Sequence, residues 1–374
     1  MRTLTISFFL MLFFGQGGLA QTDSLGINKI VKTTINYKYF ATADNKLFAI
    51  NDSGQVVIWN LNKLDTIHFS HNDTSFRYTA ITKDRQNQIF IGTNKGDIYK
   101  VNPTDLSYSL FLDDKYYVHA ICFNSDNKMF LIVPAAVYEP SSKKHWNNFT
   151  HEKNGMITRK KVLGLFWKTT NKYFDMPQLT SIDNHDRIWM TSSYGEFGGS
   201  IQLFDTKKHK ELNDKFDGLD MGLLFPKSVF SDDKGNTYIT SGLQHFMNWG
   251  EIYKIDEHRT VTKIYDCKDY RDTTKNKFED AGIFVGPGAY NKTDNSIYFA
   301  TSRGFYKAAL PSTGKLQNPQ LLFNPTLSWE REPLAIGIGM TIKRMEFTTD
   351  NKLIFLTAND GMGIYHNNKL TLLK

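Results

Sequence analysis

One short phrase recurs along the chain, and its recurrence constrains the fold more than any other feature. Each copy has a polar turn of Asp, Asn or Gly followed by an apolar or aromatic pair. The seven copies are ADNKLF (43–48), RQNQIF (85–90), SDNKMF (125–130), NHDRIW (184–189), DKGNTY (233–238), TDNSIY (293–298) and TDNKLI (349–354). Successive copies begin 40 to 60 residues apart. A period of this length indicates an array of similar structural units.

Each copy has the composition of a β-hairpin. Asp and Asn suit the turn because their side chains bond to nearby backbone and tolerate left-handed dihedrals. Aromatic and β-branched residues suit the strands. A Gly-bearing turn and a third strand follow, as in GDIYKVNP, and then a weaker fourth, as in LSYSLFL. Four strands per repeat predict an all-β fold, a seven-bladed β-propeller with four-stranded antiparallel blades. A β-sandwich would give no reason for the recurring phrase.

The two ends of the chain bear on domain organisation. The start has Arg2, an apolar stretch from Ile6 to Phe14 and small residues ending at Ala20. This pattern predicts a signal peptide at 1–20, since the stretch is too short to span a membrane. We expect one propeller domain at 21–374, soluble and extracytoplasmic, either periplasmic or secreted. KLTLLK (369–374) can supply the last blade's fourth strand. Residues before Thr34 could then clasp that edge, although the sequence does not decide how the ring closes.

Charge and cysteine content narrow the class of partner. Removing the signal peptide takes away Arg2, which leaves 44 basic and 38 acidic residues, a net charge of +6. This modest surplus forms no Lys/Arg stripe, so it favours an anionic ligand weakly and does not indicate nucleic acid. Cys122 lies in apolar AICF and Cys267 in charged YDCKD. Whether they pair stays open, but the fold cannot depend on a disulfide framework.

The segment YTAITKDRQNQIFIGTNKGDIYKVNP (78–103) resembles the repeats of two-component regulator propellers. That pattern has an apolar strand, Asp, a short turn, an aromatic-IGT strand and then G-apolar-x-Tyr. IWMTSSYG and TYITSG are similar to the IGT element. The resemblance implies a propeller that senses an extracellular ligand, often a glycan, and signals through an attached kinase. It covers the repeats alone, without a kinase region or a membrane span.

Loops that depart from the repeat are the candidates for function. In a propeller, the segment entering the innermost strand and the loop joining the second and third strands share one face. The entry segments at 140–177, 257–284 and 310–342 are long, and the loops at 192–200 and 241–251 are enlarged. Side chains suited to stacking a sugar or a flat ligand there are Tyr194, Glu196, Phe197, His245, Phe246, Met247 and Trp249. Alternatively, Phe246, Met247 and Trp249 cap the apolar space between blades.

A second set of candidates lies where each inner strand begins. Counting eight residues back from the third residue of each repeated phrase gives Tyr37, Thr79, His119, Gln178, Lys227, Pro287 and Lys343, with Arg77 and Arg344 nearby. Four of these nine residues carry a fixed positive charge and none is acidic. A central funnel with this lining would attract an acidic sugar or a phosphate-bearing ligand. The alternative is a register error, because a shift of one residue turns every side chain to the other face.

Catalytic motifs are scarce. The sequence has no HxH, HExxH, CxxC, GxSxG or phosphate-loop spacing, so we expect no metal site and no cofactor. Asp183, His185 and Asp186 lie together in SIDNHDRIW, but this is a repeat turn. SDDKGNTY (231–238) matches the Asp box of sialidases, which is also a turn device. Glu196 and His245 are weak candidates for acid–base catalysis.

The sequence therefore predicts a module that binds a small-molecule or glycan ligand, or an envelope or extracellular protein, on its loop-rich face. The expected ligand-binding residues are Lys227, Lys343, His119, Gln178, Tyr194, His245 and Trp249. One alternative is a carbohydrate-active lyase or hydrolase on the same scaffold, although a role without catalysis is favoured. Another is a scaffold subunit of a cell-envelope assembly.

Overall fold

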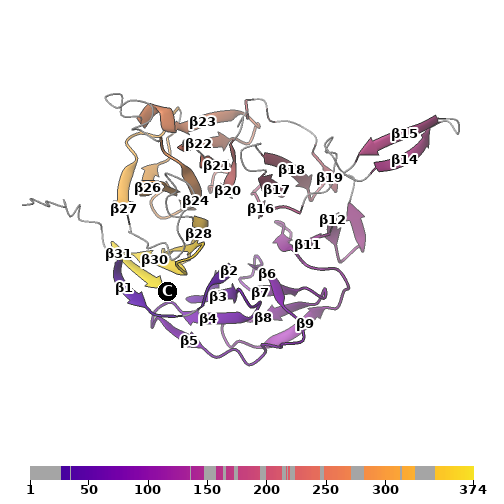
Figure 1. Cartoon of the computed structure of the whole chain (residues 1–374), viewed down its shortest axis with the longest axis horizontal. Helices are drawn as coiled ribbons and strands as arrows, with labels where there is room; N and C mark the ends of the chain where they lie inside the picture. The colour runs from indigo at the N-terminus through magenta and orange to yellow at the C-terminus, as the bar shows by residue number, and fades with distance from the viewer. Residues whose placement is uncertain are drawn as a thin grey trace, which may run out of the picture.

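The computed structural model describes residues 27–33, 35–134, 136–146, 157–162, 166–171, 176–193, 199–212, 216, 218–219, 224–244, 248–270, 282–311, 314–324 and 342–374. The described strands form seven blades around one axis, which confirms the predicted propeller (Figure 1). Each blade is an antiparallel sheet whose first strand lies nearest the axis and whose fourth lies at the rim.

The strands follow one another in chain order from axis to rim. The first three blades consist of β2 (Tyr37–Ala43), β3 (Lys46–Asn51), β4 (Val56–Asn60) and β5 (Asp65–Ile67); β6 (Tyr78–Lys83), β7 (Ile89–Thr93), β8 (Ile98–Val101) and β9 (Tyr108–Leu112); and β10 (Ala120–Phe123), β11 (Met129–Val133), β12 (Ala136–Glu139) and β13 (Lys144–Trp146). The other four consist of β16 (Leu179–Ile182), β17 (Arg187–Ser193), β18 (Gly199–Asp205) and β19 (Lys210–Glu211); β20 (Phe225–Ser231), β21 (Thr237–Gln244), β22 (Asn248–Ile255) and β23 (Val261–Asp266); β24 (Val285–Asn291), β25 (Ser296–Thr301), β26 (Gly304–Ala309) and β27 (Gln320–Phe323); and β28 (Ile342–Phe347), β29 (Leu353–Thr357), β30 (Met362–His366) and β31 (Lys369–Leu373).

Two elements lie outside the blades. A hairpin of β14 (Ile157–Val162) and β15 (Phe166–Asn171) stands out from the ring between the third and fourth blades (Figure 1). A short 3-10 helix, η2 (Cys267–Tyr270), follows the fifth blade. Within the part of the chain that the structure describes, no helix has the length and apolar character needed to cross a membrane.

The ring closes at the seventh blade. β31 completes this blade, and β1 (Ile27–Val31) pairs with the outer edge of β31 in parallel. Lys374 donates its backbone N–H to Val31 O (2.9 Å), and the Asn28 side chain accepts a bond from Leu370 N (2.7 Å). The segment before Thr34 thus clasps a blade that already has four strands.

The repeated phrase forms the turn between the first and second strands. In five blades the turn is closed by a backbone hydrogen bond between residues three apart and ends in a left-handed residue, a common plan for three-residue hairpins. The φ angles at Asn87, Asn127, Asp186, Gly235 and Asn351 are 63°, 59°, 59°, 83° and 66°. The first blade instead has a two-residue turn in which Asp44 (φ 46°) and Asn45 (φ 56°) are both left-handed. Asp, Asn and Gly recur because these residues tolerate that conformation.

In these turns a buried side chain accepts hydrogen bonds from backbone N–H groups of the turn. Asp183 Oδ1 accepts bonds from the backbone N–H groups of His185 (2.9 Å) and Arg187 (3.0 Å). The same pair of bonds, to the residues two and four positions later, recurs at Asp84, Asn124 and Asp232. The repeated Asp and Asn residues therefore satisfy backbone donors that the tight turn would leave unpaired.

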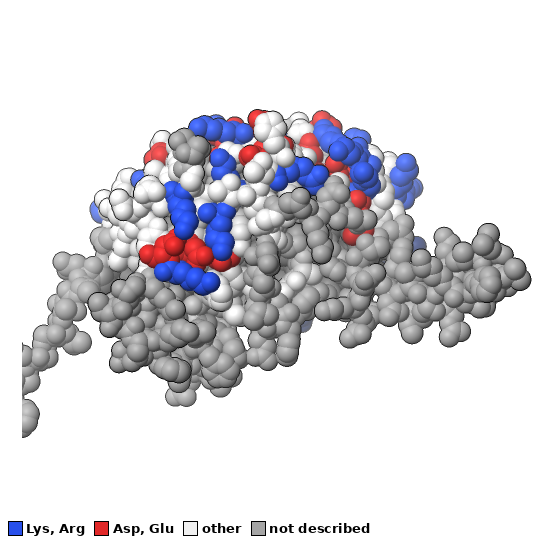
Figure 2. Space-filling view, turned by 90° about the horizontal axis from the view of Figure 1, so that it is seen from above, with Lys and Arg blue, Asp and Glu red and all other residues white. Residues whose placement is uncertain are grey.

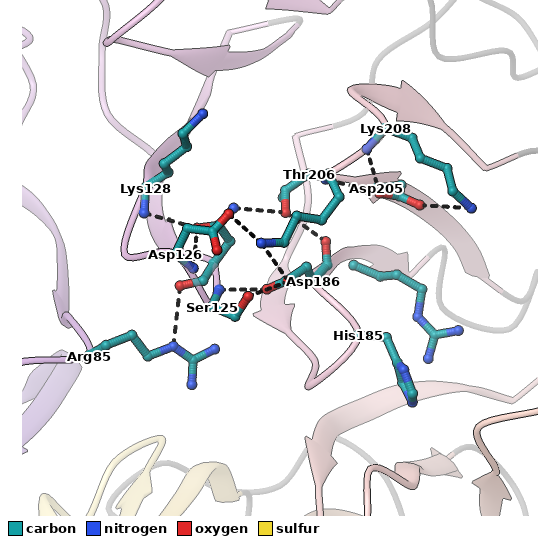
Figure 3. Close-up of polar contacts among 12 residues, drawn as sticks. Arg85, Ser125, Asp126, Lys128, His185, Asp186, Asp205, Thr206 and Lys208 are labelled. Atoms are coloured by element: carbon teal, nitrogen blue, oxygen red, sulfur yellow. Dashed lines mark hydrogen bonds and ion pairs between the residues drawn. The ribbon is translucent and has the colours of Figure 1, made fainter.

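Contacts between neighbouring turns join the blades into a belt on this face, which we call the turn face. Figure 3 shows Asp186 of the fourth blade facing Ser125 of the third, with bonds from the Ser125 N (2.6 Å) and Oγ (2.7 Å). His185 Nε2 lies 2.7 Å from Gly235 O of the fifth blade. Asp183, His185 and Asp186 of SIDNHDRIW thus all have structural partners.

The hydrophobic core lies between adjacent blades. One cluster joins the seventh blade to the first, with Ile354 and Leu356 packed beside Phe40. Another joins Phe130 of the third blade to Phe204 of the fourth. Because each sheet packs on both faces, second strands such as β7 and β29 are buried at every residue and read as continuous apolar runs. Cys122 and Cys267 are both buried and unpaired.

Candidate ligand site on the entry face

The inner strands share an irregularity near their start. The register shifts between Tyr37 and Tyr39, Tyr78 and Ala80, Pro226 and Ser228, Val285 and Gly288, and Ile342 and Arg344. The residues outside the pairing are Lys38, Thr79, Lys227, Gly286 with Pro287, and Lys343. Such a bulge bends the strand and redirects the side chain of its extra residue. We call this end of the ring the entry face.

The third and fourth blades have the equivalent feature just before their inner strands. His119 N donates to Ile132 O (2.8 Å), although the partner of Ile132 is Ala120. Gln178 N likewise donates to Thr191 O (2.8 Å), whose partner is Leu179. Counting back from the turns therefore identified corresponding positions in these blades.

In the first blade the count is off by one residue. Its turn is one residue shorter than the common plan, so the bulge lies at Lys38 and not at Tyr37. Tyr37 is buried instead, and its hydroxyl accepts a bond from Trp59 Nε1 (2.9 Å). The correction adds one more cation to the entry face.

A hollow of about 380 Å³ lies on the entry face between the first two blades. Its lining residues are Lys38, Tyr39, Asp52, Gly54, Arg77, Tyr78, Thr79, Asn94 and Tyr117. They come from the starts of β2 and β6, from two loops between second and third strands, and from the segment before β10. This entry-face hollow has a volume in the range typical of ligand sites, roughly 300 to 1,000 Å³.

Tyr39 and Tyr117 give the entry-face hollow exposed aromatic surface. Their side chains are 37% and 40% exposed, which is unusual for large rings. Burial of part of the ring raises the pKa of Tyr39, and the neighbouring Tyr117 hydroxyl raises it further. The sequence analysis did not single out either tyrosine. Tyr39 directly follows the bulge at Lys38, which the count from the turns placed one residue too early.

Two hydrogen bonds hold the backbone of Arg77, and its guanidinium forms no ion pair within the described residues. Its backbone N–H donates to Asn94 Oδ1 (2.8 Å), and its carbonyl accepts a bond from Asn94 N (2.9 Å). Gly54 has φ 78°, and a Cβ there would lie 2.7 Å from Arg77 Cβ, so glycine makes room for the arginine stem. No carboxylate among the described residues pairs with the Arg77 guanidinium.

Lys38 is partly neutralised. Its Nζ donates to the backbone oxygen of Asp52 (3.0 Å) and lies 3.9 Å from the Asp52 carboxylate. Because both side chains are about half exposed, this pair contributes little binding energy of its own. The hollow therefore keeps a net positive charge, carried chiefly by Arg77.

Lys227 lies in an aromatic setting on the fifth blade. Its Nζ is 3.8 Å from the centroid of the Phe225 ring and 5.3 Å from that of Phe284. Burial lowers its pKa to about 8, so the amine is still mainly charged at pH 7. None of the described carboxylates forms an ion pair with it. The two ring faces stabilise the cation and leave its charge uncompensated.

The seventh blade adds Lys343, which is exposed and has no ionic partner within the described ranges. The neighbouring Arg344 is neutralised, because its Nη2 lies 2.9 Å from Glu346 Oε2. Arg77, Lys227 and Lys343 are thus three cations of the entry face that form no ion pair with a carboxylate among the described residues. On the side of the molecule that Figure 2 shows, the described basic and acidic side chains intermingle.

The other predicted residues occupy varied settings. His119 is half-buried with Nε2 2.6 Å from Pro177 O, and exposed Gln178 donates to Ser193 O (3.2 Å). Trp249 is half-buried and packs against the apolar cluster between the fifth and sixth blades, with Lys268 Nζ 4.1 Å from its ring. Tyr194, Glu196 and His245 lie outside the described residues, as do Phe197, Phe246 and Met247.

The described residues include no group of three His, Cys, Asp or Glu side chains arranged as metal ligands. The arrangement on the entry face can instead hold a flat or ring-shaped ligand against tyrosine while fixed cations face its negative groups.

No protein-family model matches the chain, and no curated protein sequence matches it. Solved propeller structures do match over nearly the whole length. A chain of the hydrazine synthase of Kuenenia stuttgartiensis has a TM-score of 0.54 at 10% identity, covering 92% of this chain and 97% of that one. YCF48 bound to D1 peptide gives 0.54 at 9% identity, with 92% and 95% covered. A chain of a mitotic checkpoint complex gives 0.52 at 10% identity, with 96% of each covered. At this identity the likeness shows the fold alone.

Proposed function

We propose that this protein is a binding module that holds an anionic ligand on its entry face. The observation that carries the proposal is the presence of three cations, Arg77, Lys227 and Lys343, beside the starts of the inner strands, none of which has an acidic partner among the described residues. Fixed charges of one sign, held on rigid strands, attract and orient a ligand of opposite sign. Tyr39 and Tyr117 add a surface on which a sugar ring or a peptide side chain can stack.

An acidic glycan is the ligand that this chemistry favours. Its pyranose rings suit the exposed tyrosines, and its carboxylates suit arginine and lysine. The repeats that resemble two-component regulator propellers fit the same proposal, since that resemblance implies recognition of an extracellular glycan. Export through residues 1–20 belongs to the proposal too, and N-terminal sequencing of the mature protein tests it.

Isothermal titration calorimetry tests the ligand chemistry. The titrants are oligogalacturonate and its fully methyl-esterified form, which has the same rings without charge. We expect only the acid to bind, with an affinity that falls as salt screens the charges. An Arg77→Gln, Lys343→Gln double variant should bind about tenfold more weakly, a loss of about 1.4 kcal/mol for two exposed charge contacts.

The matched control is a Lys63→Gln, Lys234→Gln double variant. It removes the same amount of charge from two exposed lysines in loops on the turn face. Equal binding of the esterified sugar, or an equal loss of affinity in the control variant, would contradict the proposal. Binding of an acidic peptide in preference to the sugar would keep the anion site and assign it to a protein partner. Turnover of the sugar would instead favour the carbohydrate-active enzyme.

A further inference from the structure

A second hollow, of about 440 Å³, lies toward the rim of the ring between the first and second blades. It is lined by Ser70, His71, Asn72, Asp73, Thr74, Phe76, Tyr99 and Tyr108. These residues come from the segment that crosses from β5 to β6 and from the outer strands β8 and β9. We call it the rim pocket. It shares no lining residue with the entry-face hollow.

Four aromatic rings form one wall of the rim pocket. His71 stacks on Tyr108 with centroids 4.3 Å apart, and Tyr108 stacks on Tyr99 at 4.6 Å. Tyr99 and Phe76 are nearly parallel, at 16°, but their centroids are 5.9 Å apart. Both rings line the pocket and are partly exposed. The face of an aromatic ring carries partial negative charge.

The floor of the rim pocket is held rigid by Asn72. Its side-chain amide accepts a bond from Val56 N (2.8 Å) and donates one to Val56 O (2.8 Å). These two bonds tie the crossing segment to the backbone of β4. The pocket is therefore formed before any ligand arrives, which lowers the entropic cost of binding.

Carboxylates surround the same rings. Asp73 lines the pocket and is oriented by a bond from Ser75 N (2.7 Å). Besides burial, the negative charges of Asp97, Asp73 and Asp113 raise the pKa of Tyr99. The positive charge of Lys95 acts in the opposite direction on the pKa values of Asp73 and Asp97, although Lys95 forms no ion pair with either carboxylate in the described part of the chain. The pocket thus combines partly exposed aromatic rings with the exposed carboxylate of Asp73.

We propose that the rim pocket binds an organic cation, namely an alkylammonium or quaternary ammonium group. Such a group gains both from the aromatic rings and from the Asp73 carboxylate that line the pocket. A neutral sugar would use the rings but leave the negative charge uncompensated, and an anion would be repelled. The cation can come from a small molecule or from a lysine side chain of a partner protein.

Choline and 3,3-dimethyl-1-butanol distinguish a cation site from a merely apolar one, because they have the same shape and differ in charge. Titration of the folded protein, followed by NMR or calorimetry, should show choline binding about tenfold more tightly than the alcohol. Asp73→Asn should weaken choline binding about fivefold, since it removes the charge and keeps the turn. Tyr99→Leu should weaken it to a similar extent without removing any charge.

Asp105→Asn is the matched control. Asp105 is also exposed and accepts the same kind of bond, from Ser107 N (2.9 Å), but it does not line the rim pocket. Each variant is compared at a temperature well below its own melting point. The proposal is overturned if the alcohol binds as well as choline, if Asp73→Asn matches the control, or if no cation binds.

A pair of acetylated peptides, Gly-Lys-Gly and Gly-Gln-Gly, separates the two sources of the cation. Stronger binding of the lysine peptide than of choline supports a partner side chain as the ligand. Stronger binding of choline supports a small molecule. Either preference supports the site, whereas equal binding of the lysine and glutamine peptides, together with failure of choline, refutes it. None of these outcomes depends on the anion site on the entry face.

Discussion

Asp183 offers a sharp test of whether the repeated turns stabilise the fold or take part in chemistry. Its side chain is 1% exposed, and Oδ2 accepts bonds from Arg187 Nε (2.6 Å) and Trp189 Nε1 (2.7 Å). Arg187 is itself only 6% exposed. Asp183→Asn keeps the size of the side chain and one acceptor oxygen, but it removes the charge that compensates the buried guanidinium.

The expected loss of stability follows from that burial. Removing one member of a buried ion pair costs about 3 to 5 kcal/mol, because the other charge stays buried without its partner. The new amide group also meets the N–H groups that the carboxylate had accepted, which pushes the loss toward the upper half of that range. For a domain of about 350 residues, 4 kcal/mol corresponds to a fall in melting temperature of about 5 °C.

Thermal unfolding followed by circular dichroism or calorimetry measures this fall. The control is Asp233→Asn, which removes an exposed carboxylate 3.1 Å from Lys292 in the next repeat turn. An exposed pair of this kind contributes at most about 1 kcal/mol. The reasoning is refuted if Asp183→Asn melts within a degree of the wild type, or if it abolishes ligand binding while leaving the melting temperature unchanged.

Three further predictions concern charge, packing and ring closure. Burial lowers the pKa of Lys227 to about 8, below its value of about 10.4 in an unfolded chain, so the folded protein loses this proton first. The wild type should therefore gain stability relative to Lys227→Met as pH rises from about 8 to about 10, and its affinity for an anion should fall above pH 8; melting curves and titrations across this range check both. Gly242→Ala should lower the free energy of unfolding by about 1 to 3 kcal/mol in calorimetry, because the added methyl group would overlap the backbone oxygen of Val285. Removal of residues 1–33 should leave a folded ring by gel filtration and circular dichroism, because β31 completes the last blade without β1.

The turns could be predicted in detail because their chemistry is local. A left-handed backbone at Asn87 or Asn127 depends on the residue itself and on its immediate neighbours. The recurrence of Asp and Asn every 40 to 60 residues therefore identified the blades, and it also indicated that Asp183 and Asp186 serve the turn.

The residues of the entry face were harder to predict from the sequence. The sequence pointed to equivalent residues such as Lys227 and Lys343 but missed Lys38, because one turn is a residue shorter than the others. A β-bulge leaves no mark in composition, since it depends on how the strand meets its neighbours in the ring. Loop length directed attention to the fourth and fifth blades, whereas the hollow that the structure describes lies between the first and second.

The sequence by itself determined the number of blades, the position of each turn and the apolar runs that fill the space between sheets. These properties follow from local backbone preference and from the alternation of side chains along a strand, and both depend only on residues that are adjacent in the sequence. Tertiary structure alone decided which side chains meet. Arg77 reaches the entry-face hollow because Gly54 and Asn94, from loops of two different blades, hold its backbone there. The rim pocket exists for the same reason, since its rings and its carboxylate come together only when the first blade is packed against the second.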